Sequence, residues 1–240
     1  MITLKRLISL GLTLALTLTL TGCPSFFGLG GDGSPKKTPK KSGTTSRSAT
    51  TEEARAQTTM AAALLMDGDY GRALPELTKA KEMDPKNADV DNYLGLTYFG
   101  LKDYGQAVTS FENALKLNPK RSDIRNNLGL VYLNQQNYDK ALEEFNNCLK
   151  DLTYQKKQLP LSNIGLAYLE MGRYDESLAA LTRAVEVAPN YPKSYQLIGR
   201  VHLAKGQPGE AAKYLRKAQE LDPNDSFTQQ LLNEATNKGG

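Results

Sequence analysis

The chain has 240 residues, with 30 lysines and arginines, 26 aspartates and glutamates, one histidine and two cysteines. Its net charge of +4 lies near the N-terminus, because residues 54–240 contain 23 basic and 23 acidic residues. A nucleic-acid-binding fold needs a basic face, so this balance argues against a nucleic-acid partner. No cysteine and histidine cluster has the spacing of a metal site.

Residues 1–22 have the pattern of an export signal. Lys5 and Arg6 supply the positive start, and the mostly apolar run from Leu7 to Leu20 follows. This run of 14 residues is shorter than the about 20 residues that a membrane-spanning helix needs. The sequence therefore predicts a signal peptide.

The signal ends in Leu20-Thr21-Gly22-Cys23, which resembles the bacterial lipobox. The resemblance implies a diacylglyceryl thioether and an N-acyl chain on Cys23, and several acyl chains make a stable anchor. The alternative is an ordinary signal peptide with an incidental cysteine. Pro24 follows the cysteine; resemblance to enterobacterial sorting then implies an outer-membrane lipoprotein that faces the periplasm. Apart from this covalent lipid, we expect no cofactor.

Residues 23–51 are expected to form the lipidated N-terminus and a flexible tether, before a folded domain at 52–240. The segment is rich in Gly, Ser, Thr, Pro and Lys and has almost no apolar residue after Leu29. It cannot bury enough surface to order itself. Its lysines could contact anionic lipid head groups or belong to a solvated spacer.

From residue 54 the sequence repeats with a period of 34, which is typical of arrays of helical hairpins. The eighth position of each repeat is small: Ala61, Gly95, Gly129, Gly165 and Gly199. The repeats are 54–87, 88–121, 122–155, 158–191 and 192–225. Residues 226–237 are predicted to form a final capping helix, because such an array needs a polar cap.

These repeats match the tetratricopeptide repeat, which has a small residue at positions 8, 20 and 27, a large one at 24 and proline at 32. Gly129, Ala141 and Phe145 occupy positions 8, 20 and 24 of the third repeat. Glycine inside a helix costs about 1 kcal/mol relative to alanine, so its repetition indicates close helix–helix approach. The match implies an all-α superhelix of about five hairpins plus the cap. Cys148 stands at position 27, where we expect a buried small side chain.

Two residues are inserted between the third and fourth repeats, within the segment from Asp151 to Pro160. This could be a tolerated loop insertion. It is also similar to an interruption in the type IV pilus lipoproteins of the PilF, PilW and Tgl kind. In that family an Asn-Leu-Gly-Leu helix follows the interruption. The corresponding residues here are Ser162-Asn163-Ile164-Gly165-Leu166. The resemblance implies a pilotin, which binds secretin subunits in the periplasm and promotes their assembly.

A groove for the partner is expected on the inner face, lined by the first helix of each hairpin. Positions 9 and 12 form a double apolar stripe. This stripe could be exposed to a partner, or it could be packed as core. The polar side chains at position 5 could form hydrogen bonds with the backbone of a bound peptide. The predicted groove residues are Leu65, Asn92, Leu96, Phe99, Asn126, Leu130, Leu133, Ser162, Leu166, Leu169, Gln196, Arg200 and Leu203.

Other functions have less support in the sequence. Thr58 and Ala62 replace the Lys and Asn of the carboxylate clamp in chaperone-binding repeats, so a reader of chaperone tails is not expected. His202 stands at a packing position; we expect neither catalysis nor a small-molecule substrate. The remaining alternative to a pilotin is a general periplasmic adaptor for cell-envelope proteins.

Overall fold

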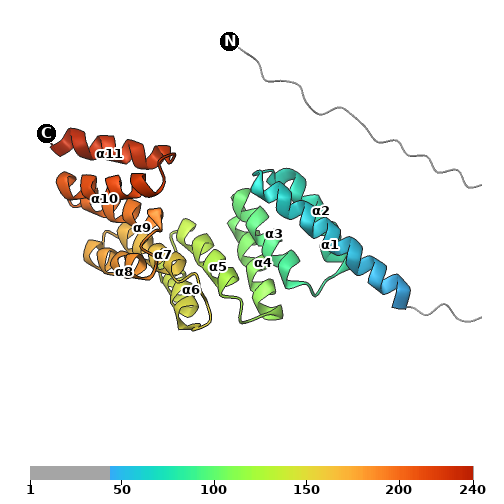
Figure 1. Ribbon diagram of the computed structural model, residues 1–240. Helices are drawn as coiled ribbons and strands as arrows, with labels where there is room; N and C mark the ends of the chain where they lie inside the picture. Colours follow the sequence, from blue (N-terminus) through green and yellow to red (C-terminus); the bar gives the residue numbers. More distant parts are fainter. Residues whose placement is uncertain (1–43, 240) are drawn as a thin grey trace, which may run out of the picture. The chain divides into compact units, whose positions relative to one another are not determined.

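The computed structural model describes residues 44–239, with side chains from residue 50, within one compact unit. The predicted signal peptide, the lipidation site Cys23 and most of the predicted tether lie outside these residues. All regular structure in the described part is helical. Its helices lie side by side in chain order from α1 to α11 (Figure 1). None of them combines the length and apolarity that crossing a bilayer requires.

Five antiparallel helical hairpins follow one another along the described chain, and the predicted all-α superhelix is confirmed. The hairpins are α1 (Thr44–Met66) with α2 (Tyr70–Met83), α3 (Ala88–Gly100) with α4 (Tyr104–Leu117), α5 (Ser122–Asn134) with α6 (Tyr138–Lys150), α7 (Gln158–Glu170) with α8 (Tyr174–Val187), and α9 (Pro192–Ala204) with α10 (Pro208–Leu221). A single helix, α11 (Ser226–Gly239), follows the last hairpin.

The start of α1 corrects the predicted tether, which was expected to run to Thr51. The helix begins at Thr44, so residues 44–51 are helical. Adding a residue to an existing helix costs far less than nucleating one. Because α1 is already helical where it packs in the first hairpin, its extension to Thr44 requires no new nucleus.

Close packing within each hairpin explains the repeated glycine. A Cβ atom added to Gly95 would lie 2.6 Å from the ring of Phe111, and one added to Gly129 would lie 2.5 Å from the ring of Phe145. Leu181 and Leu215 approach Gly165 and Gly199 in the same way, and all four large side chains are fully buried. The large residue at position 24 therefore fills the space that the small one at position 8 leaves in its own hairpin.

The C-terminal helix α11 covers the fifth hairpin. Asp225 caps it, because its carboxylate oxygens accept hydrogen bonds from the backbone N–H groups of Phe227 (3.1 Å) and Thr228 (3.3 Å). Leu231, Leu232 and Ala235 of α11 pack against Leu215. Gln229, Gln230 and Asn233 face solvent, as a cap requires.

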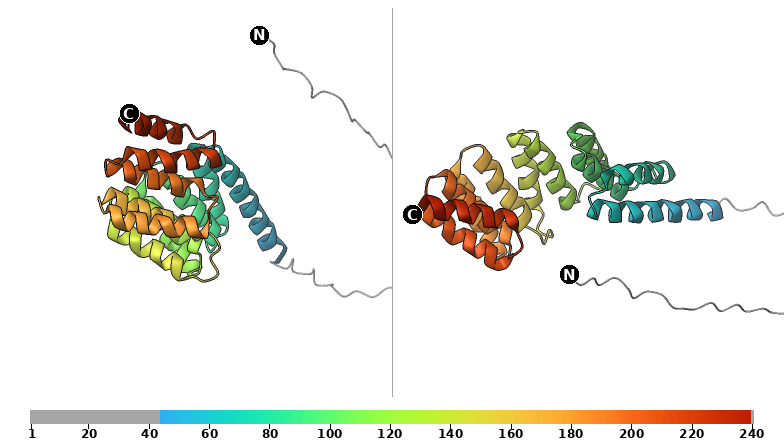
Figure 2. Two further views of the ribbon diagram at one scale, coloured as in Figure 1. Left: turned by 60° about the vertical axis from the view of Figure 1, so that its left-hand side comes forward. Right: turned by 90° about the horizontal axis from the view of Figure 1, so that it is seen from above.

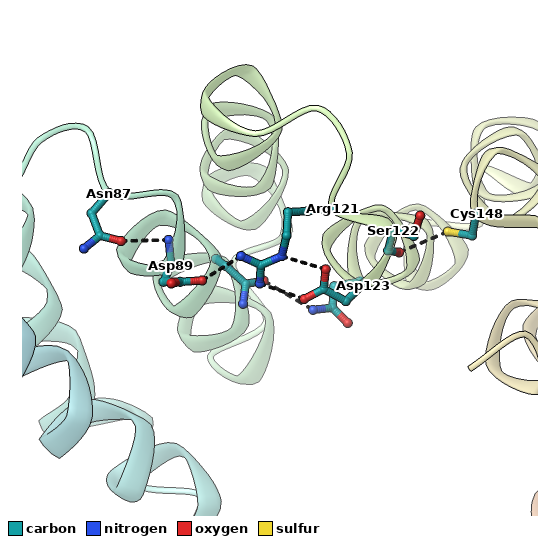
Figure 3. Close-up of polar contacts among 8 residues, drawn as sticks. Asn87, Asp89, Arg121, Ser122, Asp123 and Cys148 are labelled. Atoms are coloured by element: carbon teal, nitrogen blue, oxygen red, sulfur yellow. Dashed lines mark hydrogen bonds and ion pairs between the residues drawn. The ribbon is translucent and has the colours of Figure 1, made fainter. Parts of the chain in front are cut away.

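The free cysteine Cys148 is fully buried at the junction of α6 with α5. Its Sγ donates to the carbonyl oxygen of Ser122 at 3.2 Å (Figure 3). Burial raises the pKa of the thiol to about 12. The thiolate, which is the reactive form, is therefore scarce in the native protein at pH 8.

We expect Cys148 in a Cys23→Ser chain to react with a thiol reagent at pH 8 on the order of a thousandfold more slowly when native than when unfolded. Rising pH should speed native labelling up to the raised pKa, because only the thiolate attacks. Reaction with a chromogenic disulfide, with and without guanidinium chloride, measures both rates. Equal rates would contradict the buried position of Cys148.

Candidate functional site

The polar row at position 5 lies between hairpins and not in an open groove. Asn92 and Asn126 are 7% and 6% exposed. Asn127 Nδ2 donates to Asn92 Oδ1 at 3.4 Å, and Asn163 Nδ2 donates to Asn126 Oδ1 at 2.9 Å. Both asparagine side chains therefore bond to the first helix of the next hairpin.

Ser162 and Gln196, at the same position of the fourth and fifth repeats, also form hydrogen bonds to the element that follows their hairpin. Ser162 Oγ lies 2.9 Å from Ser194 Oγ. Gln196 Nε2 donates to Asp225 Oδ2 at 2.6 Å and to Thr228 Oγ1 at 2.8 Å, which joins α9 to α11. The prediction that position 5 serves a partner's backbone is therefore wrong. The residues concerned are Asn92, Asn126, Ser162 and Gln196.

The apolar stripe at positions 9 and 12 is partly core. Leu133 is 8% exposed, and the remaining members are half-buried. Their inner sides contact the hydrophobic clusters between hairpins, so only their outer sides are accessible. The half-buried members are Leu65, Leu96, Phe99, Leu130, Leu166, Leu169, Arg200 and Leu203.

Two predicted groove residues meet in a pocket between α5 and α7. Leu133 and Leu166 line a cavity of about 250 Å³ together with Tyr138 and Glu170. Glu170 accepts from the guanidinium of Arg200 at 3.0 Å, so Arg200 is held in an ion pair. The pocket thus places the side chains of Leu133 and Leu166 beside the Glu170–Arg200 ion pair, with polar residues on the remaining wall.

A larger pocket of about 540 Å³ lies between α1 and α3. Tyr93 and Asp89 line it from α3, and Ala62 and Arg55 line it from α1. The predicted residue set contains none of its lining residues. The signal was available in part, because two of the lining residues, Thr58 and Ala62, stand at positions 5 and 9 of the first repeat.

An arginine fixes the rim of this larger pocket. The guanidinium of Arg121 donates to Asp89 at 2.7 Å and, with two nitrogens, to Asp123 at 2.8 Å (Figure 3). The hydrogen bond from Arg121 lowers the pKa of Asp123. Asn87 Oδ1 accepts from the backbone N–H of Asp89 at 3.0 Å, which caps α3 beside the same rim. The carboxylate of Asp89 is therefore held at the pocket edge.

The interruption between the third and fourth repeats forms a loop at residues 151–157, before α7. Asp151 accepts hydrogen bonds from Ser122 Oγ at 2.7 Å and from the backbone N–H of Thr153 at 2.9 Å. Hydrogen bonds from Thr153 and Ser122 lower the pKa of the Asp151 carboxyl to about 2. Leu152, by contrast, is 83% exposed.

The single histidine is held by its neighbours. The ring of His202 stacks on that of Tyr214 with centroids 5.4 Å apart, and its Nδ1 lies 2.8 Å from Gln207 Oε1. In the part of the chain that the structure describes, no three His, Cys, Asp or Glu side chains gather as a metal site would require.

The fold and these inner-face pockets define a helical-hairpin scaffold, in which the binding surface is built from successive first helices. Residues 94–149 and 163–226 match the model of the tetratricopeptide repeat family. The chain belongs to that family, whose extended concave surfaces bind other proteins.

The fold of this chain is also similar to the solved structures of several individual proteins. The chain is 25% identical to PilW, a widely conserved type IV pilus biogenesis factor, with a TM-score of 0.69 over 77% of this chain and 86% of that one. Pseudomonas aeruginosa PilF has the same fold, at 18% identity and a TM-score of 0.66 over 79% and 88% of the two chains. YrrB, a tetratricopeptide repeat protein with an unusual peptide-binding site, shares the fold at 22% identity, with a TM-score of 0.56 over 82% and 98%. A search of curated proteins gave no significant match.

Proposed function

We propose that this chain is an outer-membrane lipoprotein of the type IV pilus system, which binds secretin subunits on its inner face and assists their assembly. The observation that carries the proposal is the match to PilW, which extends over 77% of this chain and 86% of that one. The resemblance of residues 20–23 to a lipobox adds independent support for the anchor.

The inner face suits an extended segment of the partner. Asn127 and Asn163, at position 6, use their Nδ2 groups to bond to the preceding hairpin, which leaves their carbonyl oxygens for other bonds. Packed helices lie 8–10 Å apart, so two hairpin steps separate the larger and smaller pockets by about 20 Å. An extended chain of about six residues spans that distance. Alternate side chains of one segment could therefore enter both pockets.

The lipid would place this surface at the target membrane. Residues 24–43 separate Cys23 from the first residue of α1, and 20 residues reach at most about 70 Å. Attachment to the membrane makes capture of a subunit at that membrane effectively intramolecular. The proposed role is thus capture and delivery, without catalysis, a cofactor beyond the lipid, or a small-molecule substrate.

The proposal predicts that loss of the lipid separates binding from delivery. A Cys23→Ala chain should keep its helical content and its secretin binding, because Cys23 lies outside the folded unit. It should nevertheless deplete secretin multimers at the outer membrane nearly as much as deletion of the gene does. Immunoblots of unboiled outer-membrane fractions from wild-type, Cys23→Ala and deletion strains measure the multimers.

Normal secretin multimers in the deletion strain would refute the pilotin role. If pili were also normal and affinity capture from membranes returned mainly cell-wall enzymes, the same inner face would belong to a general periplasmic adaptor.

A further inference from the structure

We propose that one edge of the array, at the loops after α4 and α6, binds a lipid surface that carries anionic head groups. Residues 116–123 and 150–157 form this edge, which we call the basic edge. Its exposed leucines would enter the interfacial layer, and its lysines would contact phosphate groups. The inference goes beyond the proposed binding of a protein partner, and its test does not depend on the pilus assignment.

The two loops of the basic edge are joined in the structure. In consecutive antiparallel hairpins each second helix ends where the next first helix begins, so the loops after α4 and α6 lie at the same edge (Figure 1). Ser122 Oγ, at the start of α5, donates to Asp151 at 2.7 Å, and Cys148 Sγ donates to the carbonyl oxygen of Ser122 at 3.2 Å. The basic edge is therefore one continuous surface.

The charge of the basic edge is not a requirement of the repeat. Residues 116–123 and 150–157 contain six basic and two acidic residues. The equivalent segments of the first, fourth and fifth repeats, 82–89, 186–193 and 220–227, contain two basic and seven acidic residues. A local excess of positive charge thus stands in a domain whose total charge is balanced, and it favours a negatively charged ligand.

Four exposed lysines of the basic edge are not neutralised by carboxylates. In the described residues, ion pairs are formed by six other lysines but by none of these four. Two of the four donate only to the amide oxygens of asparagines one turn earlier, at 3.3 and 3.0 Å. Their ammonium groups are therefore available to phosphate groups. The four residues are Lys116, Lys120, Lys150 and Lys156.

The two carboxylates of the basic edge already have partners. Asp123 accepts from the guanidinium of Arg121 at 2.8 Å. Asp151 accepts from Ser122 Oγ and from the backbone N–H of Thr153. Neither carboxylate therefore pairs with a lysine of this edge.

Exposed apolar side chains also gather where the second helices end. Seven large hydrophobic side chains are exposed in the described residues, and four of them lie at this side of the array: Leu117, Leu152, Val187 and Phe227. Leu117 and Leu152 belong to the basic edge itself. The hydrogen bonds of Asp151 hold the backbone beside Leu152. Leucines flanked by lysines are typical of a surface that lies in a membrane interface.

A membrane is the occupant that the position of the N-terminus favours. The first helices begin at this side of the array, α1 among them, and the N-terminal part of α1 extends beyond the end of α2 (Figure 2). The chain toward Cys23 therefore joins the array at this side. A lipid on Cys23 would keep the basic edge near a bilayer, where tethering makes even a weak attraction effective.

The test is the binding of residues 24–240, a chain that contains every residue of the folded unit, to lipid vesicles. One set of vesicles contains equal parts of phosphatidylglycerol and phosphatidylcholine, and the neutral reference contains phosphatidylcholine alone. Co-sedimentation should show binding to the anionic vesicles, and this binding should weaken as the salt concentration is raised. Binding that is equal for the two sets would overturn the proposal.

The double variant Lys120→Gln with Lys156→Gln should lower the partition coefficient on anionic vesicles by about tenfold or more, because each lysine close to such a surface raises it about fivefold. The matched control is Lys102→Gln with Lys213→Gln, which removes two exposed lysines outside the basic edge and gives the same net charge. Both double variants keep residues 24–43, so the lysines of that segment contribute equally.

The apolar contribution is measured by Leu152→Ser, which should lower the partition coefficient about fivefold or more. Met66→Ser is its control, because Met66 is 90% exposed at the end of α1, on the opposite side of the array. Circular dichroism of all the variants separates a loss of binding from a loss of fold.

Equal losses in the edge variants and their controls would overturn the proposal, since net charge or residues 24–43 would then account for the binding. If no vesicles were bound, but a protein captured from membranes were lost with the double variant of Lys120 and Lys156 alone, the basic edge would belong to an acidic protein segment. That result would overturn the assignment to a lipid surface as well.

Discussion

Replacing Gly129 with alanine is expected to destabilise the protein by about 1–3 kcal/mol, although alanine is the better helix former. The new Cβ atom would lie 2.5 Å from Phe145, whose ring is fully buried between α5 and α6. The ring is packed among core side chains and cannot move aside cheaply. The overpacking should therefore exceed the gain in helix propensity.

The matched control is Gly105→Ala in the first turn of α4. A Cβ atom there would meet nothing closer than Asp103 Oδ1 at 3.7 Å, so the same substitution should be neutral or stabilise by up to about 1 kcal/mol. Urea unfolding followed by circular dichroism measures both variants. Opposite signs would support the close approach within the hairpin, whereas equal stability of Gly129→Ala and the wild type would contradict it.

The hairpins could be predicted because the residue types at a few fixed positions of the repeat determine how the two helices pack. A glycine such as Gly129 and a large partner such as Phe145 recur at fixed spacing, and each contact lies within one hairpin. Likewise, Tyr70 and Tyr104 begin second helices at the same position of their repeats. Periodicity along the sequence is sufficient for such local contacts.

The inner face could be predicted only in part, because it depends on how neighbouring hairpins cross. Asn126 and Asn127 are adjacent in the sequence and about 100° apart around α5. Both are polar, so periodicity alone cannot say which one faces the next hairpin. The crossing of α5 and α7 buries Asn126 and leaves Asn127 half-buried. Asn126 is therefore a contact between hairpins and not a groove residue.

The helical start at Thr44 was missed for a different reason. Composition correctly indicates that residues 44–51 lack the apolar side chains of a core. Composition alone does not show that a helix packed in the first hairpin can continue into such a segment. The pocket between α1 and α3 was missed as well, since its walls combine side chains of two repeats with the loop residue Asn87.

The second large effect is expected from Leu166→Arg on the inner face. Leu166 is half-buried and lines the pocket between α5 and α7. An arginine at this position can extend its guanidinium group into solvent, so the fold should be retained. It would nevertheless place a charge and a long side chain where the partner's apolar group is expected. Because a few central contacts dominate such interfaces, we expect secretin affinity to fall about tenfold or more.

Leu115→Arg supplies the matched control. Leu115 is also half-buried, but it lines a separate cavity of about 300 Å³ whose walls include the second helices α4 and α6. Both variants replace a half-buried leucine with arginine, so thermal unfolding should show similar losses of stability. Only the inner-face variant should lose its partner.

The most direct test of the inner-face account is therefore affinity capture from solubilised membranes with three baits: the wild-type chain, Leu166→Arg and Leu115→Arg. Quantitative mass spectrometry of the eluates should show the secretin with the wild type and with Leu115→Arg, and a depletion of about tenfold or more with Leu166→Arg. Full recovery with Leu166→Arg, or loss with Leu115→Arg alone, would contradict binding through the first helices of the repeats.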